Sequence, residues 1–521
     1  MSQEKNFKTL QQIATWSRHS VWKPHEPQRR APGNLVMDSS PHSPLLELPA
    51  ELLHTIFAHL DLEDVLTARK ACSTLAAIGV DHFGDEVALV YHHEKFKALT
   101  QIAKHPGLAK RMRSLFYAVD RFKELSFEEW VDKRVSEEPF LADNCSAEES
   151  YREFLEVCRQ QVKIHDERYD YSCLRSFFQG SCNIREVTMV SHAHCERELG
   201  AEKTAFGKSM MRPHRDKSWS DAGTDQVCSM AHAIQHSGLQ LDSLTIAGVS
   251  HTIFDTSTDR GVSTYYALKA IMPPPTSTRV FIQAWPPELI DQDEESEDSD
   301  WQPDIDKDLL QSVREQSVSV FEEGYVGKIL AEARDLRVLK LEVPVLGPYY
   351  DASGIARIHR TLRRLEFPHL YELALSQCAM RGKWLVDFLL RHKTTLRRVS
   401  LRHVSLRERQ PSWRNVFTRI SCQLPHLNKL ALEGEFHRDS HPQLLFGYAS
   451  AALSYSKAME KFVIRGGAYP SWTAIKRQLL YGPSAEESAN ESVDSVPWNP
   501  PEDDLQPDDP KLDYSTDEYD E

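Results

Sequence analysis

Apolar and polar positions alternate in two different ways along the 521 residues of the chain. Residues 44–80 show the spacing of short helices, and residues 81–480 show helical stretches that alternate with short strand-like runs. Residues 1–43 and 481–521 have little apolar periodicity and many Pro and polar side chains, which predicts disordered tails. The acidic run 291–306 is expected to be a disordered insert, because like charges at this density repel one another.

The block 44–80 predicts three short helices. Pro49 suits a first helical position, because its missing N–H would be unsatisfied there. Asp61 is a suitable N-cap for the second helix, and Gly79 a suitable end for the third. The apolar residues of the first helix form one broad stripe: Leu52, Leu53, Ile56, Phe57 and Leu60.

Three helices in so few residues bury little apolar surface, since domains below roughly 40 residues are marginal alone. Leu45, Leu46 and Leu48 precede the first helix and add apolar surface outside its stripe. Exposed apolar patches mark interfaces, so a partner could cover this surface. The block could equally pack on the rest of its own chain, and periodicity alone favours neither alternative.

The order of residues in this block resembles that of an F-box. The positions that carry the resemblance are Leu48, Pro49, Glu51, Leu52, Leu53, Ile56, Leu60, Leu62, Asp64, Val65, Cys72 and Leu75. It implies a Skp-type adaptor as the partner, and through it a cullin, in an SCF-type (cullin–RING) E3 ubiquitin ligase. By the same resemblance the adaptor contacts would be Leu48, Pro49, Leu52, Ile56, Leu60, Leu62, Val65 and Leu66.

Apolar triplets spaced L-x-x-L-x-L recur in residues 81–480, and this spacing is the strand core of a leucine-rich repeat. A repeated strand and helix would form a coil with a parallel sheet on one side and helices on the other. The copies are uneven, and the whole chain is similar to fungal F-box proteins with a degenerate repeat region. The eight copies begin at Met112, Ile184, Leu241, Leu336, Leu370, Leu396, Leu427 and Met459. Of these, the first three and the last are weaker matches to the spacing.

The expected fold class is therefore α/β, with an N-terminal three-helix F-box, an irregular leucine-rich-repeat-like solenoid and disordered tails. The competing interpretation of residues 81–480 is an unrelated α/β domain. A curved array would offer a long sheet face that suits client binding. Several outward positions are basic and would suit an acidic or phosphorylated client, although an ordinary solvated face explains them as simply. These candidates are Arg337, Lys340, Arg398, Arg402 and Lys429.

The net charge of −15 is unevenly distributed. Residues 483–521 hold 14 acids and one base, and residues 291–306 hold nine acids and no base, which leaves the remainder at +7. Apolar runs are shorter than the roughly 18–20 residues of a membrane helix, and no secretory signal is evident. Nine cysteines without a dense framework favour a reduced setting in the cytoplasm or nucleus.

No pattern for chemistry stands out. Phosphate-binding loops, nucleophile elbows, CxxC pairs and HExxH motifs are absent from the sequence. His192, His194 and Cys195, with Cys182 upstream, resemble metal ligands but lack a suitably spaced second pair. We therefore expect no catalytic residue, cofactor, nucleic acid or membrane, and predict a subunit that holds an unknown client for ubiquitination. The alternatives are an enzyme with an unrecognised α/β catalytic domain and an F-box scaffold outside any ligase.

Overall fold

A computed structural model shows two compact units, whose boundary among the described residues falls between Leu373 and Ala374. We call the described residues before and after this boundary unit 1 and unit 2. The predicted tails, the acidic insert and the His192, His194 and Cys195 cluster lie outside the described residues. The structure describes residues 44–60, 62–135, 146–191, 205–206, 209, 223–272, 277–283, 315, 318–323, 325–342, 356–407, 412–438, 441–446 and 450–475.

Unit 1 begins with the helical block. After a short 3-10 turn, η2 (Pro44–Glu47), come α2 (Ala50–His59), α3 (Leu62–Arg69) and α4 (Ser73–Val80), so the three predicted helices are confirmed. The prediction that Gly79 ends the third helix is wrong.

Gly79 is buried inside α4. A Cβ atom at this position would overlap Cγ and Cδ of Arg69 and lie 3.1 Å from Cε1 of Phe57. Glycine is therefore required by close packing: it lets α4 approach both α2 and α3, which it contacts.

The sheet of unit 1 consists of parallel strands, each paired with the next in chain order. The second and fourth residues of most strands are buried apolar side chains, as the triplets predicted. The strands are β1 (Glu86–Val90), β2 (Ser114–Ala118), β3 (Glu186–Val190), β4 (Ser243–Ser250), β5 (Ser277–Gln283) and β6 (Val338–Glu342), and β7 (Glu372–Ser376) holds the boundary between the units.

Two of these strands had no predicted counterpart. β5 lies in the long interval between the triplets at Leu241 and Leu336, and its first inward position is the buried Thr278. β1 has Val87 and Leu89 at its inward positions but Gly84 where the triplet needs an apolar residue. Both strands were missed because the apolar triplet is incomplete at each of them.

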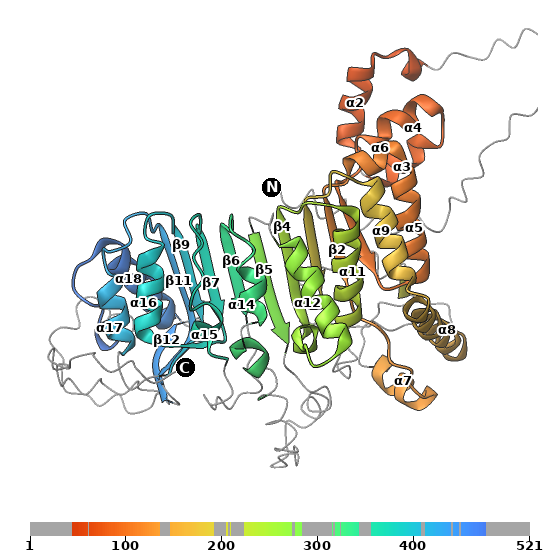
Figure 1. Ribbon diagram of the computed structural model, residues 1–521. Helices are drawn as coiled ribbons and strands as arrows, with labels where there is room; N and C mark the ends of the chain where they lie inside the picture. Colours follow the sequence, from red (N-terminus) through yellow and green to blue (C-terminus); the bar gives the residue numbers. More distant parts are fainter. Residues whose placement is uncertain are drawn as a thin grey trace, which may run out of the picture. The chain divides into compact units, whose positions relative to one another are not determined.

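Helices between the strands form a layer over one face of this sheet. α5 contacts α9, α9 contacts α11, and the contacts continue through α12 and α14 to α15. Figure 1 shows α11 and α12 side by side in front of the strands. These helices, with η5 and α6, are α5 (His93–Lys104), α6 (Pro106–Arg111), α9 (Tyr169–Gly180), α11 (Thr224–Ser237), η5 (His251–Phe254), α12 (Asp259–Ile271), α14 (Tyr325–Leu330) and α15 (Ile358–Thr361).

The opposite face of the first four strands is covered as well. Side chains of α7 (Phe127–Val135) and α8 (Ala147–Asp166) form a second core with the other residues of each strand. The long open sheet face expected from the sequence is therefore closed over β1–β4. This second core contains Val90, Phe116, Ala118, Phe122, Leu125, Trp130, Phe154, Val157, Cys158, Val190, Phe206 and Ala247.

A buried glutamine fixes α8 to the ends of the strands. The side-chain Oε1 of Gln161 accepts a hydrogen bond from the backbone N–H of Phe122 at 2.7 Å. Its Nε2 donates to the carbonyl of Tyr91 at 2.9 Å. Because buried polar backbone groups are costly when unpaired, this side chain holds α8 in one place.

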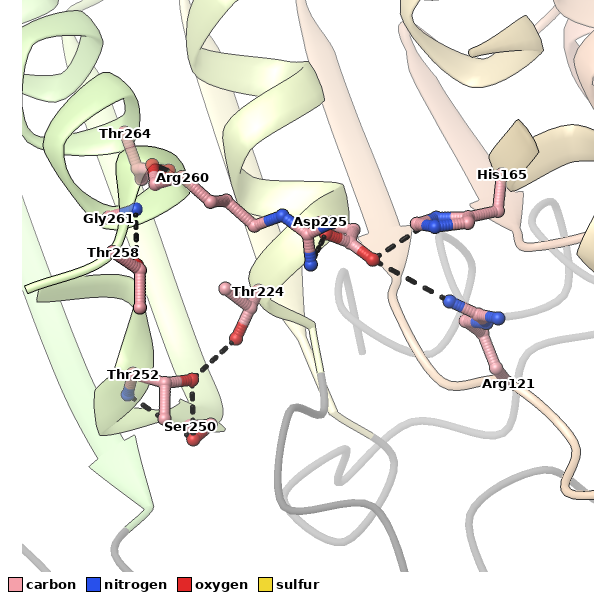
Figure 2. A network of polar contacts seen from close by, with 10 residues as sticks. All are labelled: Arg121, His165, Thr224, Asp225, Ser250, Thr252, Thr258, Arg260, Gly261 and Thr264. Atoms are coloured by element: carbon pink, nitrogen blue, oxygen red, sulfur yellow. Dashed lines mark hydrogen bonds and ion pairs between the residues drawn. The ribbon is translucent and has the colours of Figure 1, made fainter. Parts of the chain in front are cut away.

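An acidic residue at the start of α11 joins three other segments of unit 1 (Figure 2). Oδ1 of Asp225 lies 2.5 Å from Nη1 of Arg260 in α12. Oδ2 lies 3.1 Å from Nδ1 of His165 in α8 and 3.7 Å from Nη1 of Arg121 beyond β2. A carboxylate is also favoured in the first turn of a helix, so Asp225 acts as an electrostatic clamp.

We predict that Asp225→Ala lowers the free energy of unfolding by about 1–3 kcal/mol, because two arginines and a histidine lose the carboxylate that they share. The control is Asp166→Ala, an exposed residue of α8, which should change stability by less than about 0.5 kcal/mol. Urea unfolding of both variants provides the comparison. Equal stability of the two variants would show that Asp225 does not clamp the helices.

The strands of unit 2 also pair mainly in parallel. β9 and β11 pair in parallel, β10 pairs with β8 and with the end of β11, and β12 runs antiparallel to β11. α16 contacts α17, and α17 contacts α18. The elements are β8 (Ala379–Met380), α16 (Gly382–Arg391), β9 (Arg398–Arg402), β10 (Ser405–Leu406), α17 (Trp413–Ile420), β11 (Lys429–Arg438), β12 (His441–Phe446) and α18 (Ser450–Arg465).

The triplets at Leu396 and Leu427 lead into β9 and β11, whereas the strand predicted from Met459 is wrong. Met459, Phe462 and Val463 are buried on one side of α18, so their spacing belongs to a helix. None of the described helices is both long and apolar enough to cross a membrane.

Candidate functional site

The apolar stripe of α2 is divided between two environments. Leu53 and Phe57 are buried, at 2% and 3% exposure, and pack into the helical block. Leu52 and Ile56 are 50% and 37% exposed. At 3.6 residues per turn each pair follows its own line along the helix, so one line fills the core and the other faces outward.

Further apolar surface adjoins these two residues. Leu45 in η2 is 41% exposed, Pro49 at the start of α2 is exposed, and Leu48 and Leu60 are partly buried. Of seven large apolar side chains exposed in the described part of the chain, three belong to this block. We call the surface of Leu45, Leu48, Pro49, Leu52, Ile56 and Leu60 the α2 face, and its clustering marks an interaction surface.

Three of the predicted adaptor contacts, Leu62, Val65 and Leu66, are not part of the α2 face. Val65 is 1% exposed and packs inside the block, where Leu75 and Ile78 are also buried, so we assign it to the core. The side chains of Leu62 and Leu66 lie outside the described residues. Leu45 was not in that set, although its place in the leucine run before Pro49 was a usable signal.

Arg69 joins the second and third helices of the block. Its Nε donates to the carbonyl of Ala76 at 3.0 Å, and its guanidinium carbon lies 4.6 Å from the centre of the Phe83 ring. Burial lowers the pKa of this guanidinium. Arg69 therefore connects α3 to α4 and to the residues that follow α4.

The block is also joined to the start of the sheet. Nε of Arg111 in α6 donates to the carbonyl of Phe83 at 2.7 Å, and its Nη1 lies 3.5 Å from the Asp81 carboxylate. Nδ1 of His54 lies 3.2 Å from Nε2 of His82. Burial, and then the neighbouring His54, lower the pKa of His82. These contacts support the side of the block away from Leu52 and Ile56.

Two of the five candidate client-binding residues are paired with acids. Nζ of Lys340 in β6 lies 2.8 Å from Oε1 of Glu372, and Nε of Arg402 in β9 lies 3.8 Å from Oε1 of Glu433. Arg337 is exposed just before β6 in unit 1. The charges of Lys340 and Arg402 are therefore partly neutralised by acids of their own unit.

The other two candidates lie together in unit 2. Arg398 and Lys429 are the first residues of β9 and β11, and they are directly opposite each other in the parallel pairing. Both side chains are exposed. The structure thus brings these two together within the described residues.

The polar clusters that might serve chemistry have structural partners instead. Asp225 is shared by two arginines and a histidine, and no serine or cysteine contact with His165 is recorded among the described residues. One pocket lies between the residues that follow α4 and the end of α6. It is lined by His82, Phe83, Gly84, Asp85, Lys110, Arg111 and Arg113. Across the described residues no group of three or more His, Cys, Asp or Glu is placed to hold a metal ion.

Because the α2 stripe is divided, substitutions at neighbouring positions should change stability by very different amounts. Leu53→Ala should lower the stability of the block by about 2–5 kcal/mol, because it leaves a cavity. Leu52→Ala should change stability by less than about 0.5 kcal/mol. Hydrogen exchange within residues 45–80 measures both. Similar losses in the two variants would contradict the division into a buried line and an exposed line.

Comparison with known proteins points to one family of domains for this block. Residues 45–80 match the family model of the F-box domain, a range that contains all three helices α2, α3 and α4. A search of curated proteins found no similar sequence. F-box domains in general bind the Skp-type adaptor of SCF complexes, and the α2 face is an exposed apolar surface within the matched range.

Proposed function

Because residues 45–80 match an F-box domain, we propose that this chain is the substrate-recognition subunit of an SCF-type E3 ubiquitin ligase. One structural observation carries the proposal: Leu52 and Ile56 face outward on a helix whose other large apolar residues, Leu53 and Phe57, are buried. A soluble partner that covers them removes apolar surface from water.

The α2 face would form the centre of the contact with the adaptor. Full burial of one exposed Leu or Ile contributes about 1.5–3 kcal/mol. Association also has a cost of at least about 4 kcal/mol in lost freedom of motion, so a single side chain would not suffice. Leu45, Leu52 and Ile56 together, extended by Pro49, supply enough apolar surface to form such a centre.

The remaining residues of both units would serve to hold a client protein. We infer that they form a degenerate leucine-rich-repeat-like region of the fungal F-box type, supported by parallel strands joined through helices. Ubiquitin transfer would then occur on other subunits, and this chain would act by proximity rather than as an enzyme. Such a role belongs to the cytoplasm or nucleus.

The adaptor contact is tested by the double substitution of Leu52→Asp and Ile56→Asp in the full chain. Two carboxylates on the α2 face should weaken binding to a purified Skp-type adaptor by about a hundredfold or more, which is about 2.7 kcal/mol. Isothermal titration calorimetry gives the affinity. The thermal unfolding curve should remain that of the unmodified chain.

The matched control is Ala58→Asp, which places a carboxylate on another exposed side of α2. This variant should retain affinity for the adaptor within about threefold. If the double variant and the control bind equally well, the α2 face is not the docking surface. If the adaptor binds the unmodified chain but no cullin co-purifies with it, the chain acts outside a ligase.

A further inference from the structure

The described part of unit 2 has a strongly uneven charge. Residues 374–407, 412–438, 441–446 and 450–475 hold 15 Lys and Arg but four Asp and Glu, a net charge of +11. Twelve of the 15 bases are exposed. A positive surface of this size attracts an anionic partner and destabilises the isolated unit through self-repulsion.

Three of the four acids are already used inside the unit. Glu433 pairs with Arg402, and Glu435 lies 3.0 Å from Nε2 of His437. Oε1 of Glu460 accepts a hydrogen bond from the backbone N–H of Leu430 at 3.1 Å. The described residues of unit 2 therefore cannot balance most of their own positive charge.

Part of this charge is concentrated where strands begin and helices end. Arg398 and Lys429 lie opposite each other, and the carbonyl of Arg397 accepts hydrogen bonds from the backbone N–H groups of Asn428 and Lys429. This brings the starts of β9 and β11 side by side with their basic residues at the same level.

The carboxyl ends of α17 and α18 adjoin this strand edge. The hydroxyl of Ser421, just after α17, donates to the carbonyl of Phe462 in α18 at 2.9 Å. The N–H of Cys422 donates to the carbonyl of Val463. Glu460 reaches β11 from the same helix. The exposed bases at these strand starts and helix ends are Arg397, Arg398, Arg419, Lys429, Lys461 and Arg465, and we call them together the basic edge.

The sequence that follows unit 2 has the complementary charge. Residues 483–521 hold 14 acids and one base, a net charge of −13. The last described residues double back along α18, because the Tyr469 ring packs on Phe462 and the Trp472 ring packs on Tyr455. The described chain therefore ends beside α18, and ten residues separate it from the first acid of the acidic segment.

The connection is long enough for the acidic segment to return to the basic edge. Ten residues lie between Ile475 and the first acid, Glu486, and an extended chain spans at most about 3.3–3.6 Å per residue. The 16-residue α18 is about 24 Å long at 1.5 Å per residue. A linker of this length also gives an effective concentration of order millimolar.

We propose that the acidic segment 483–521 binds the basic edge of unit 2 in the same chain. The contact joins opposite charges, so it is screened by salt over a Debye length of about 10 Å at 0.1 M. Any other anionic partner of the basic edge must displace this segment. The proposal does not depend on adaptor binding, because none of its residues belongs to the α2 face.

The test uses a fluorescent peptide of residues 483–521 and two forms of the full chain. In one form each Asp and Glu of this segment is replaced by Asn or Gln, which vacates the basic edge. This form should bind the peptide at least about tenfold more tightly than the unmodified chain, whose own segment competes. Raising NaCl from about 0.05 M to about 0.5 M should weaken peptide binding by about tenfold or more.

Charge reversal identifies the surface. Arg398→Glu, Lys429→Glu and Lys461→Glu together, in the neutralised chain, should abolish peptide binding. The matched control reverses three exposed bases of unit 1, Lys104→Glu, Lys123→Glu and Arg175→Glu, and should leave binding within about threefold. Circular dichroism melting of each variant establishes that it is folded.

Three outcomes would overturn the proposal. The neutralised and unmodified chains would bind the peptide equally, or neither would bind it, or the unit 1 control would lose binding as completely as the unit 2 variant. A neutralised chain that bound a single-stranded oligonucleotide but not the peptide would assign the basic edge to nucleic acid instead. The first comparison needs no substitution within the units, so it holds even if the unit 2 variant fails to fold.

Discussion

The structure of the N-terminal block depends on one division of apolar surface. Helix α2 is only ten residues long, yet it supplies Leu53 and Phe57 to the core and leaves Leu52 and Ile56 outside. A block this small cannot bury both lines of side chains itself. On the inner side, the close contact of Gly79 with Arg69 and Phe57 and the hydrogen bond from Arg69 to Ala76 join the helices of the block.

The rest of unit 1 provides a rigid base for this block. Its sheet is covered on one face by the row of helices and, over the first four strands, by α7 and α8 on the other. Gln161 and Asp225 lock α8 in place through buried hydrogen bonds and shared charge. A sheet that is covered on both faces over β1–β4 is suited to position a bound subunit. It leaves a smaller open sheet face for client binding than the sequence predicted.

The helices of the block and most strands could be predicted because their apolar residues follow one period without a gap. Thr278 hid β5, since a buried threonine breaks the apolar triplet, and Met459 suggested a strand because helix and strand spacings overlap over so few residues. Neither the core position of Val65 nor the cover over β1–β4 could be predicted, because both depend on which distant residues pack together. Charge counts predicted that the residues outside the two acidic segments are mildly basic, but they did not place this charge in unit 2.

The most direct measurement is hydroxyl-radical footprinting of side chains in the full chain, alone and with a saturating Skp-type adaptor. The account predicts that Leu52 and Ile56 are oxidised readily in the chain alone and are protected several-fold by the adaptor, while Phe57 reacts slowly in both states. If Leu52 and Ile56 react slowly in the chain alone, or react equally with and without the adaptor, the exposed half of α2 is not where this protein docks.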